Sequence, residues 1–145
     1  MLPLEDALAQ MLHQLPFPTK TETLALTEAA DRVCAEDVIS PINVPSFDNS
    51  AMDGYAVRLA DLQQSMTLSV AGKSFAGNPF QGEWVAQSAV RIMTGAMIPE
   101  GADAVVMQED VTVNEDGSVT FSALPKANQN IRRIGEDVKK GDVVL

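Results

Sequence analysis

The strongest constraint on the fold is a series of short apolar runs, separated by turn-forming residues, that begins after Pro41. The runs occupy residues 68–71, 89–92, 104–107, 111–113 and 119–121. Clusters of Gly, Pro, Asn and Asp lie between them, a spacing typical of a compact sheet or a small barrel. The last two runs flank Asp116-Gly117, a dipeptide that favours the positive φ angles of a hairpin turn. The sequence therefore predicts a fold of the α+β class that is mainly β.

The first 40 residues follow a helical pattern instead. The apolar residues on one helical stripe are Leu4, Leu8, Met11, Leu12 and Leu15. They predict a helix over residues 4–15 that ends before Pro16-Phe17-Pro18. Its stripe packs either against the rest of the fold or against a second subunit, and the pattern favours neither. A short strand at 23–26 and a brief helix at 27–32 are expected to follow.

The balance of charge excludes two classes of partner. Twenty Asp and Glu residues against ten Lys and Arg give a formal net charge of −10, which repels nucleic-acid phosphates and anionic lipid headgroups. We predict no nucleic acid and no membrane among the partners. Residues 125–145 are the exception, because they carry five basic and three acidic residues and offer an anionic ligand a local site.

The single cysteine and the absence of targeting segments indicate the compartment. Cys34 cannot form an internal disulfide, and its apolar neighbours Val33 and Ala35 predict a buried structural thiol rather than a reactive one. No segment combines a basic region with an apolar signal core, and no apolar run reaches membrane-spanning length. We predict a cytoplasmic protein.

Residues 48–56, which read Asp-Asn-Ser-Ala-Met-Asp-Gly-Tyr-Ala, form the densest cluster of small and polar residues in the chain. Asp48 and Asp53 could bind Mg²⁺ or orient a water molecule. An EF-hand is excluded, because Met52 stands where an oxygen ligand is required. The alternative is a stack of Asx turns in which the loop satisfies its own backbone, and local chemistry somewhat favours it.

Two further segments carry groups suited to anion binding. In residues 91–96 a strand runs directly into a Thr94-Gly95-Ala96 turn, whose amides and hydroxyl can face an anion, although an ordinary turn explains the pattern as well. In residues 131–137, Arg132 and Arg133 neighbour two carboxylates; they form either a solvated charge run or a site that holds oxyanions bidentately. The only histidine, His13, lies on the N-terminal helix away from these loops, which argues against a triad or a histidine-based metal site.

Taken together, these segments resemble a known family. The matching blocks are residues 44–57, 71–77, 91–96, 101–109 and 130–137, in that order. They are similar to the molybdopterin molybdenumtransferases, the family of MoeA and the gephyrin E domain. The resemblance implies insertion of molybdate into adenylated molybdopterin with release of AMP, with Mg²⁺ as cofactor. It also implies a homodimer and molybdopterin adenylyltransferase as the upstream partner.

The resemblance also implies a domain arrangement and a set of site residues. An N-terminal helix and mixed α/β arm would occupy 1–40, an inserted all-β, barrel-like domain 41–137, and a strand returning into the arm 138–145. Asp53, Thr94 and Asp137 match the catalytic cleft, with Asp53 and Asp137 as Mg²⁺ ligands. The substrate-binding residues are predicted to be Asn49, Ser50, Arg132 and Arg133.

The family's nucleotide-fold domain has no counterpart in these residues, and the chain stops on the apolar run 143–145. We therefore expect the N-terminal portion of a longer enzyme, inactive by itself. The alternative is a non-catalytic β module of the biotinyl or lipoyl carrier type, which residues 136–144 also resemble. Such a carrier needs a modifiable lysine on an exposed hairpin flanked by Met or Asp, and neither Lys73 nor Lys126 has that setting.

Overall fold

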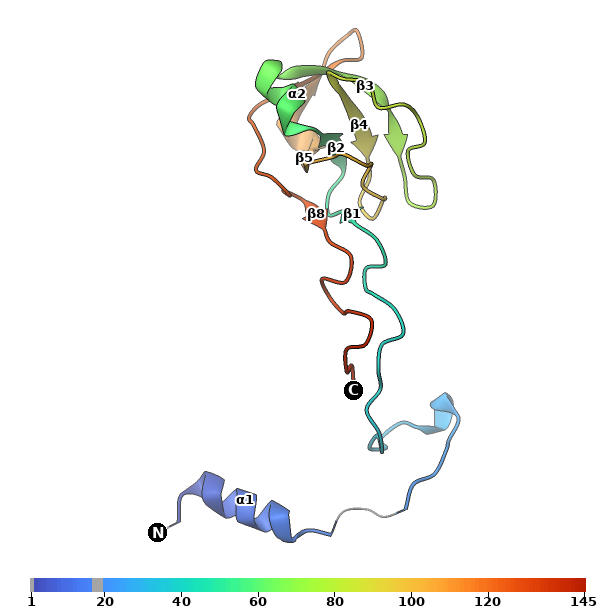
Figure 1. The fold of residues 1–145 in the computed structure, drawn as a ribbon, viewed down its shortest axis with the longest axis vertical. Helices are drawn as coiled ribbons and strands as arrows, with labels where there is room; N and C mark the ends of the chain where they lie inside the picture. Colours follow the sequence, from blue (N-terminus) through green and yellow to red (C-terminus); the bar gives the residue numbers. More distant parts are fainter. Residues whose placement is uncertain (1, 17–19) are drawn as a thin grey trace. The chain divides into compact units, whose positions relative to one another are not determined.

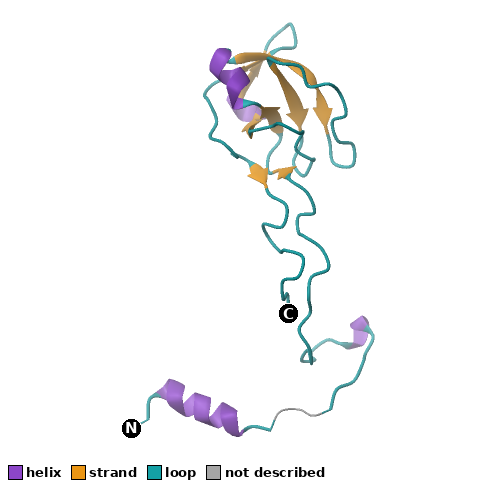
Figure 2. Cartoon of the chain, viewed as in Figure 1, coloured by secondary structure: helices purple, strands orange, loops and turns teal. Residues whose placement is uncertain are grey.

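A computed structural model describes residues 2–16 and 20–145. The chain divides into two compact units (Figures 1 and 2). One unit comprises residues 1–38 together with Leu145, and the other comprises residues 39–144. The three domain ranges implied by the resemblance stay a prediction.

The first unit contains the predicted N-terminal helix, α1 (Leu4–Gln14), and a single turn of 3₁₀ helix, η1 (Leu26–Glu28). No residue of α1 is buried, and its apolar stripe is exposed, with Leu4 81% accessible. The strand predicted at 23–26 is wrong, because no described segment pairs with it, and the helix predicted at 27–32 is reduced to the single turn η1.

The expected burial of Cys34 is also wrong, since its thiol is exposed. Phe17 and Pro18, part of the predicted link after the helix, lie outside the described residues.

The second unit is built on a curled, six-stranded sheet (Figure 1). Its strands are β2 (Gly54–Val57), β3 (Thr67–Ser74), β4 (Ser88–Ile92), β5 (Ala104–Met107), β6 (Val111–Val113) and β7 (Val119–Phe121). They lie in the order β5-β2-β4-β3-β7-β6, all antiparallel except β3 with β4. Helix α2 (Leu59–Gln64) follows β2, and η2 (Gln108–Asp110) joins β5 to β6. All five predicted strands are confirmed, as is the hairpin, in which Gly117 has φ +81°.

The sheet buries side chains on both faces, as the alternation of successive residues requires. One face carries a cluster that includes Tyr55, Val57 and Phe121 and is covered by Leu62 of α2. The opposite face carries Ala56, Val90, Ile92 and Val105. Because β2 lies between β4 and β5 and is buried on both faces, it is a rigid support for the residues that precede it.

A two-stranded ribbon leaves the sheet. Strand β1 (Asn49–Ser50) pairs antiparallel with β8 (Ile131–Arg132). The ribbon continues as two loosely bridged segments that run side by side, with Val44 opposite Val138 and Ile39 opposite Val143 (Figure 2). Within the described residues, no helix has both the length and the apolar character needed to cross a membrane.

Candidate active site

The three segments selected from the sequence meet at β1. On one side the Ser50 amide donates to the Ala96 carbonyl at 3.0 Å, and the Gly95 amide donates to the Ser50 carbonyl at 2.8 Å. On the other side Ser50 lies opposite Ile131 of β8. Backbone hydrogen bonds therefore bring residues 48–56, 91–96 and 131–137 together.

Asp53 and Thr94 are in direct contact. Asp53 Oδ1 accepts hydrogen bonds from the Thr94 amide and the Thr94 hydroxyl, each at 2.8 Å. The Asp53 carbonyl accepts from the Gln108 amide at 3.0 Å, which fixes the same loop to the end of β5. The structure thus joins two of the three predicted catalytic residues, and it leaves Thr94 exposed at the surface.

Arg91 supports this pair from β4. Its guanidinium donates to the Gly54 carbonyl at 2.7 Å and to Gln108 Oε1 at 2.5 Å, and it lies over the Tyr55 ring, 5.1 Å from the centroid. The Thr94 amide, then its hydroxyl, and to a smaller extent the charge of Arg91 hold the pKa of Asp53 below its ordinary value. Asp53 is therefore ionised throughout the physiological range. The sequence analysis gave Arg91 no role, although Arg91 begins the same motif, three residues before Thr94.

Replacing Thr94 with Val is expected to raise the pKa of Asp53, because the hydroxyl donor is lost while the amide remains. A carboxyl whose pKa falls on folding stabilises the protein fully above the unfolded pKa of about 3.9. The contribution disappears as the pH falls through the folded pKa. Because the folded pKa is closer to the unfolded value in the variant, acidification below about pH 4 should lower its free energy of unfolding by less than it lowers that of wild type. Carboxyl-carbon NMR titration of Asp53 measures the shift, and an unchanged pKa would contradict the assigned cause.

The turn after β8 holds a second cluster. Arg132 pairs with Glu136 at 2.9 Å and with Asp137 at 2.5 Å, and the Arg133 amide donates to Glu136 at 2.7 Å. Glu136 first and Asp137 second raise the pKa of Arg132 above its ordinary value. Arg132 remains 42% exposed and Asp137 48% exposed, so both can reach a ligand in solution.

The Asx-turn alternative for residues 48–56 fails for both carboxylates. Asp48 accepts from the Ile134 amide at 2.7 Å and pairs with Arg133, and Asp53 accepts from Thr94. Each carboxylate joins its loop to a distant segment rather than to its own backbone. The local side-chain contacts of this segment come from Ser50, which bonds the Met52 backbone, and from Asn49, which bonds the Phe47 carbonyl.

Asn49 and Ser50, two of the four residues predicted to bind substrate, are buried in β1. Asn49 donates to the Phe47 carbonyl at 3.2 Å. Ser50 donates to the Met52 carbonyl at 2.6 Å. Their role toward a ligand stays a prediction.

The Asp53–Thr94 pair and the Arg132–Asp137 pair remain separate: no hydrogen bond or ion pair joins them in the described part of the chain. Asp53 uses Oδ1 and Asp137 uses Oδ2, and within residues 2–16 and 20–145 the second oxygen of each carboxylate accepts no hydrogen bond. Over the same ranges, no three His, Cys, Asp or Glu side chains form a metal cluster. Mg²⁺ in proteins is commonly held by one or two carboxylates together with water and substrate oxygens, so Asp53 and Asp137 are the carboxylates to consider as ligands.

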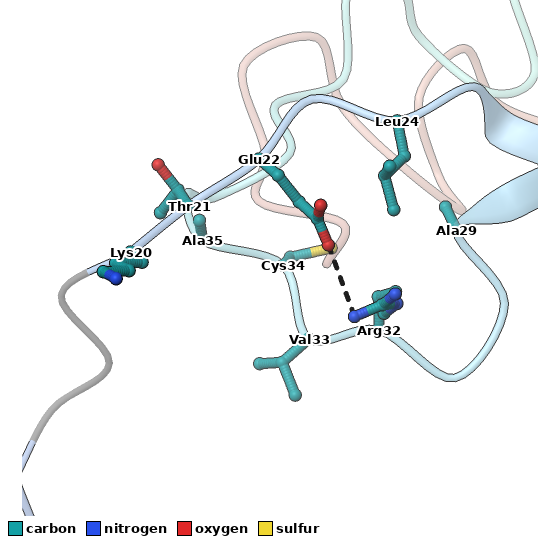
Figure 3. Close-up of a pocket in the computed structure, with 9 residues that line it drawn as sticks. All are labelled: Lys20, Thr21, Glu22, Leu24, Ala29, Arg32, Val33, Cys34 and Ala35. Carbon is teal, nitrogen blue, oxygen red and sulfur yellow. Dashed lines mark ion pairs between the residues drawn. The ribbon is translucent and has the colours of Figure 1, made fainter.

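A hollow of about 600 Å³ lies in the first unit and contains none of the predicted site residues (Figure 3). Arg32 and Glu22 form an exposed ion pair at 3.3 Å across it, and Cys34 lies on its wall. An exposed pair of this kind contributes little to stability. All of the predicted site residues lie instead in the second unit.

Comparison with known proteins finds similar sequences over the whole chain. The chain is 81% identical over its whole length to the molybdopterin molybdenumtransferase of Haemophilus influenzae, and 38% identical over 99% of its length to that of Bacillus subtilis. It covers 36% and 35% of those proteins, so it spans about a third of the relatives it matches. The carrier-type alternative is not favoured.

A solved structure supports the fold. The molybdopterin biosynthesis moeA protein from Pyrococcus horikoshii OT3 matches all of this chain with a TM-score of 0.77 and 39% sequence identity, over 39% of its own length. The family profile described as the MoeA N-terminal region (domain I and II) matches residues 2–145. The three motifs that meet at β1 therefore lie within this profile, and the chain belongs to the MoeA N-terminal family.

Proposed function

We propose that this chain is the N-terminal part of a molybdopterin molybdenumtransferase, which inserts molybdate into adenylated molybdopterin and releases AMP. The observation that carries the proposal is the meeting of three polar segments at β1, with an ionised Asp53 held by Thr94 and an exposed Arg132–Asp137 pair. The names of its relatives support the same activity.

The geometry suggests separate tasks for the two pairs. Asp53 is fixed and negatively charged, so it can orient a water molecule or a protonated oxygen, while the Thr94 hydroxyl lies beside it to contact substrate. Arg132 and Arg133 present guanidinium groups, which bind phosphate and other oxyanions bidentately. The anionic substrate would thus be held next to the carboxylates.

Mg²⁺ belongs to the proposal as a cofactor, with Asp53 and Asp137 as its protein ligands. A bound Mg²⁺ would neutralise charge on phosphate oxygens during transfer. The oxygen of each carboxylate that accepts no hydrogen bond from the described residues supports this assignment.

The 145-residue chain by itself is proposed to be inactive, because it supplies part of the relatives' length and therefore part of any shared site. A homodimer, a cytoplasmic location and an adenylated substrate delivered by molybdopterin adenylyltransferase also belong to the proposal.

Genetic complementation tests the proposal. In cells that lack their own molybdopterin molybdenumtransferase, the full-length protein carrying this chain should restore molybdoenzyme activity, and residues 1–145 alone should not. Failure of the full-length protein to restore activity, despite normal expression, would contradict the proposed function.

Replacing both Arg132 and Arg133 with Gln is expected to weaken binding of adenylated molybdopterin by about tenfold to a hundredfold, because the double change removes charge-assisted hydrogen bonds from the turn that presents the oxyanion site. Equilibrium binding to the full-length protein measures the change. Unchanged affinity would show that both arginines are surface charges.

A further inference from the structure

Asp48 makes two contacts with the turn after β8, although 85 or more residues separate them in the sequence. Its Oδ1 accepts the Ile134 amide at 2.7 Å, and its Oδ2 pairs with the Arg133 guanidinium. The same guanidinium also donates to Asn128 Oδ1. Asp48, Arg133 and Asn128 are called the β8 clamp below.

The clamp acts on the segment that presents the exposed pair. Arg133 and Ile134 lie between Arg132 and Asp137, so fixing them limits where both ends of the turn can point. The opposite strand of the ribbon adds two backbone bonds, from the Gly135 amide to the Pro45 carbonyl at 2.9 Å and from the Asp137 amide to the Val44 carbonyl at 3.0 Å. Asp48 is the side chain that ties this turn to the start of β1.

The carboxylate of the clamp is more enclosed than that of a fully solvated ion pair. Asp48 is only 31% exposed and uses both of its oxygens, one of them on a backbone amide. The Ile134 amide first, and then Arg133, lower the pKa of Asp48, so the carboxylate stays charged at neutral pH. Hydrogen bonds to an ionised group are stronger than those between neutral groups.

We propose that Asp48 is a positioning residue that, through Arg133 and the Ile134 amide, holds Arg132 and Asp137 in the orientation that binds the anionic substrate. This inference takes the identity of the substrate from the proposed function. It also separates the two arginines: Arg132 contacts substrate, whereas Arg133 acts through the turn.

The test uses Asp48→Ala and Asp48→Asn in the full-length protein, with two readouts. In Asp48→Ala, amide hydrogen exchange of residues 131–137 should rise about tenfold, and KM for adenylated molybdopterin should rise about tenfold while kcat changes less than threefold. Asp48→Asn should raise both the amide exchange and KM by less than Asp48→Ala does, because its amide oxygen can still accept a hydrogen bond from the Ile134 amide. Adding Arg133→Gln to Asp48→Ala should raise KM by less than the product of the two single effects, since both changes remove the contact between Asp48 and Arg133.

The control is Asp116→Ala, which removes a carboxylate that bonds the Ser118 amide and hydroxyl in the β6–β7 turn. It should leave exchange at 131–137 and KM unchanged. The inference is overturned if Asp48→Ala leaves exchange at 131–137 unchanged, raises exchange equally throughout the sheet, or leaves KM unchanged. If the wild-type protein transfers no molybdenum, the proposed function fails, and exchange alone then decides for or against the clamp.

Discussion

Asp53→Asn is expected to reduce molybdenum transfer by the full-length protein about a hundredfold or more, with no loss of folding. The Asn side chain keeps the size of Asp53 and one oxygen that can accept from Thr94, so the loop is retained. The negative charge is lost, and removal of one preorganised electrostatic group from an active site commonly costs a factor of about 100 to 1,000. Initial rates of AMP release at saturating substrate measure the effect.

Asp116→Asn is the matched control for this change. Asp116 also accepts from an amide and a hydroxyl, both of Ser118, and its pKa is likewise held low, by the Ser118 hydroxyl first and the amide second. It lies in the β6–β7 turn, so its loss should leave the rate within about twofold of wild type. Full activity in Asp53→Asn would remove Asp53 from the catalytic machinery.

Gly54→Ala is expected to destabilise the second unit by about 3 kcal/mol, the upper part of the usual range for overpacking. A Cβ at Gly54 would lie 1.9 Å from the Val106 carbonyl oxygen and 2.8 Å from its carbon. Both atoms are backbone of β5, so neither can rotate away. The strand that follows Asp53 would have to separate from β5, with loss of the pairing that spans Gly54–Val57.

Urea unfolding of the 145-residue chain, followed by the fluorescence of its one tryptophan, Trp84, measures this cost. Trp84 packs against the core on one face of the sheet and reports on that core. Gly77→Ala is the control: unlike Gly54, Gly77 has a positive φ, +75°, but a Cβ there meets nothing within 4 Å, so a cost of about 1 kcal/mol is expected from the backbone alone. Equal costs at the two glycines would contradict a close approach between β2 and β5.

The sequence predicted those features whose cause is local. The five strands and the hairpin at Gly117 follow from short apolar runs and turn residues, which act over a few positions. The strand at 23–26 failed because a strand exists only with a partner, and the described residues provide none there. Burial of Cys34 failed for the same reason, since apolar neighbours in sequence do not ensure a packed layer around them.

The candidate site divides in the same way, into residues selected by local motifs and residues whose contacts are distant in the sequence. The resemblance selected Asp53, Thr94 and Asp137 from their motifs, and in the structure Asp53 contacts Thr94. It gave no role to Asp48 or Arg91, because their partners lie in segments that meet only through the pairing of β1 with β8 and of β2 with β4. Contacts across 85 residues, such as Asp48 with Arg133, leave no periodic signal in one sequence.

Product formation by the purified full-length protein tests the central claim most directly. With Mg²⁺, molybdate and adenylated molybdopterin, the wild-type protein should release one AMP for each molybdenum bound to the pterin product. The Asp53→Asn variant should release about a hundredfold less in the same time, and Asp116→Asn should match wild type. AMP release without molybdenum incorporation, or equal rates in wild type and Asp53→Asn, would contradict the account.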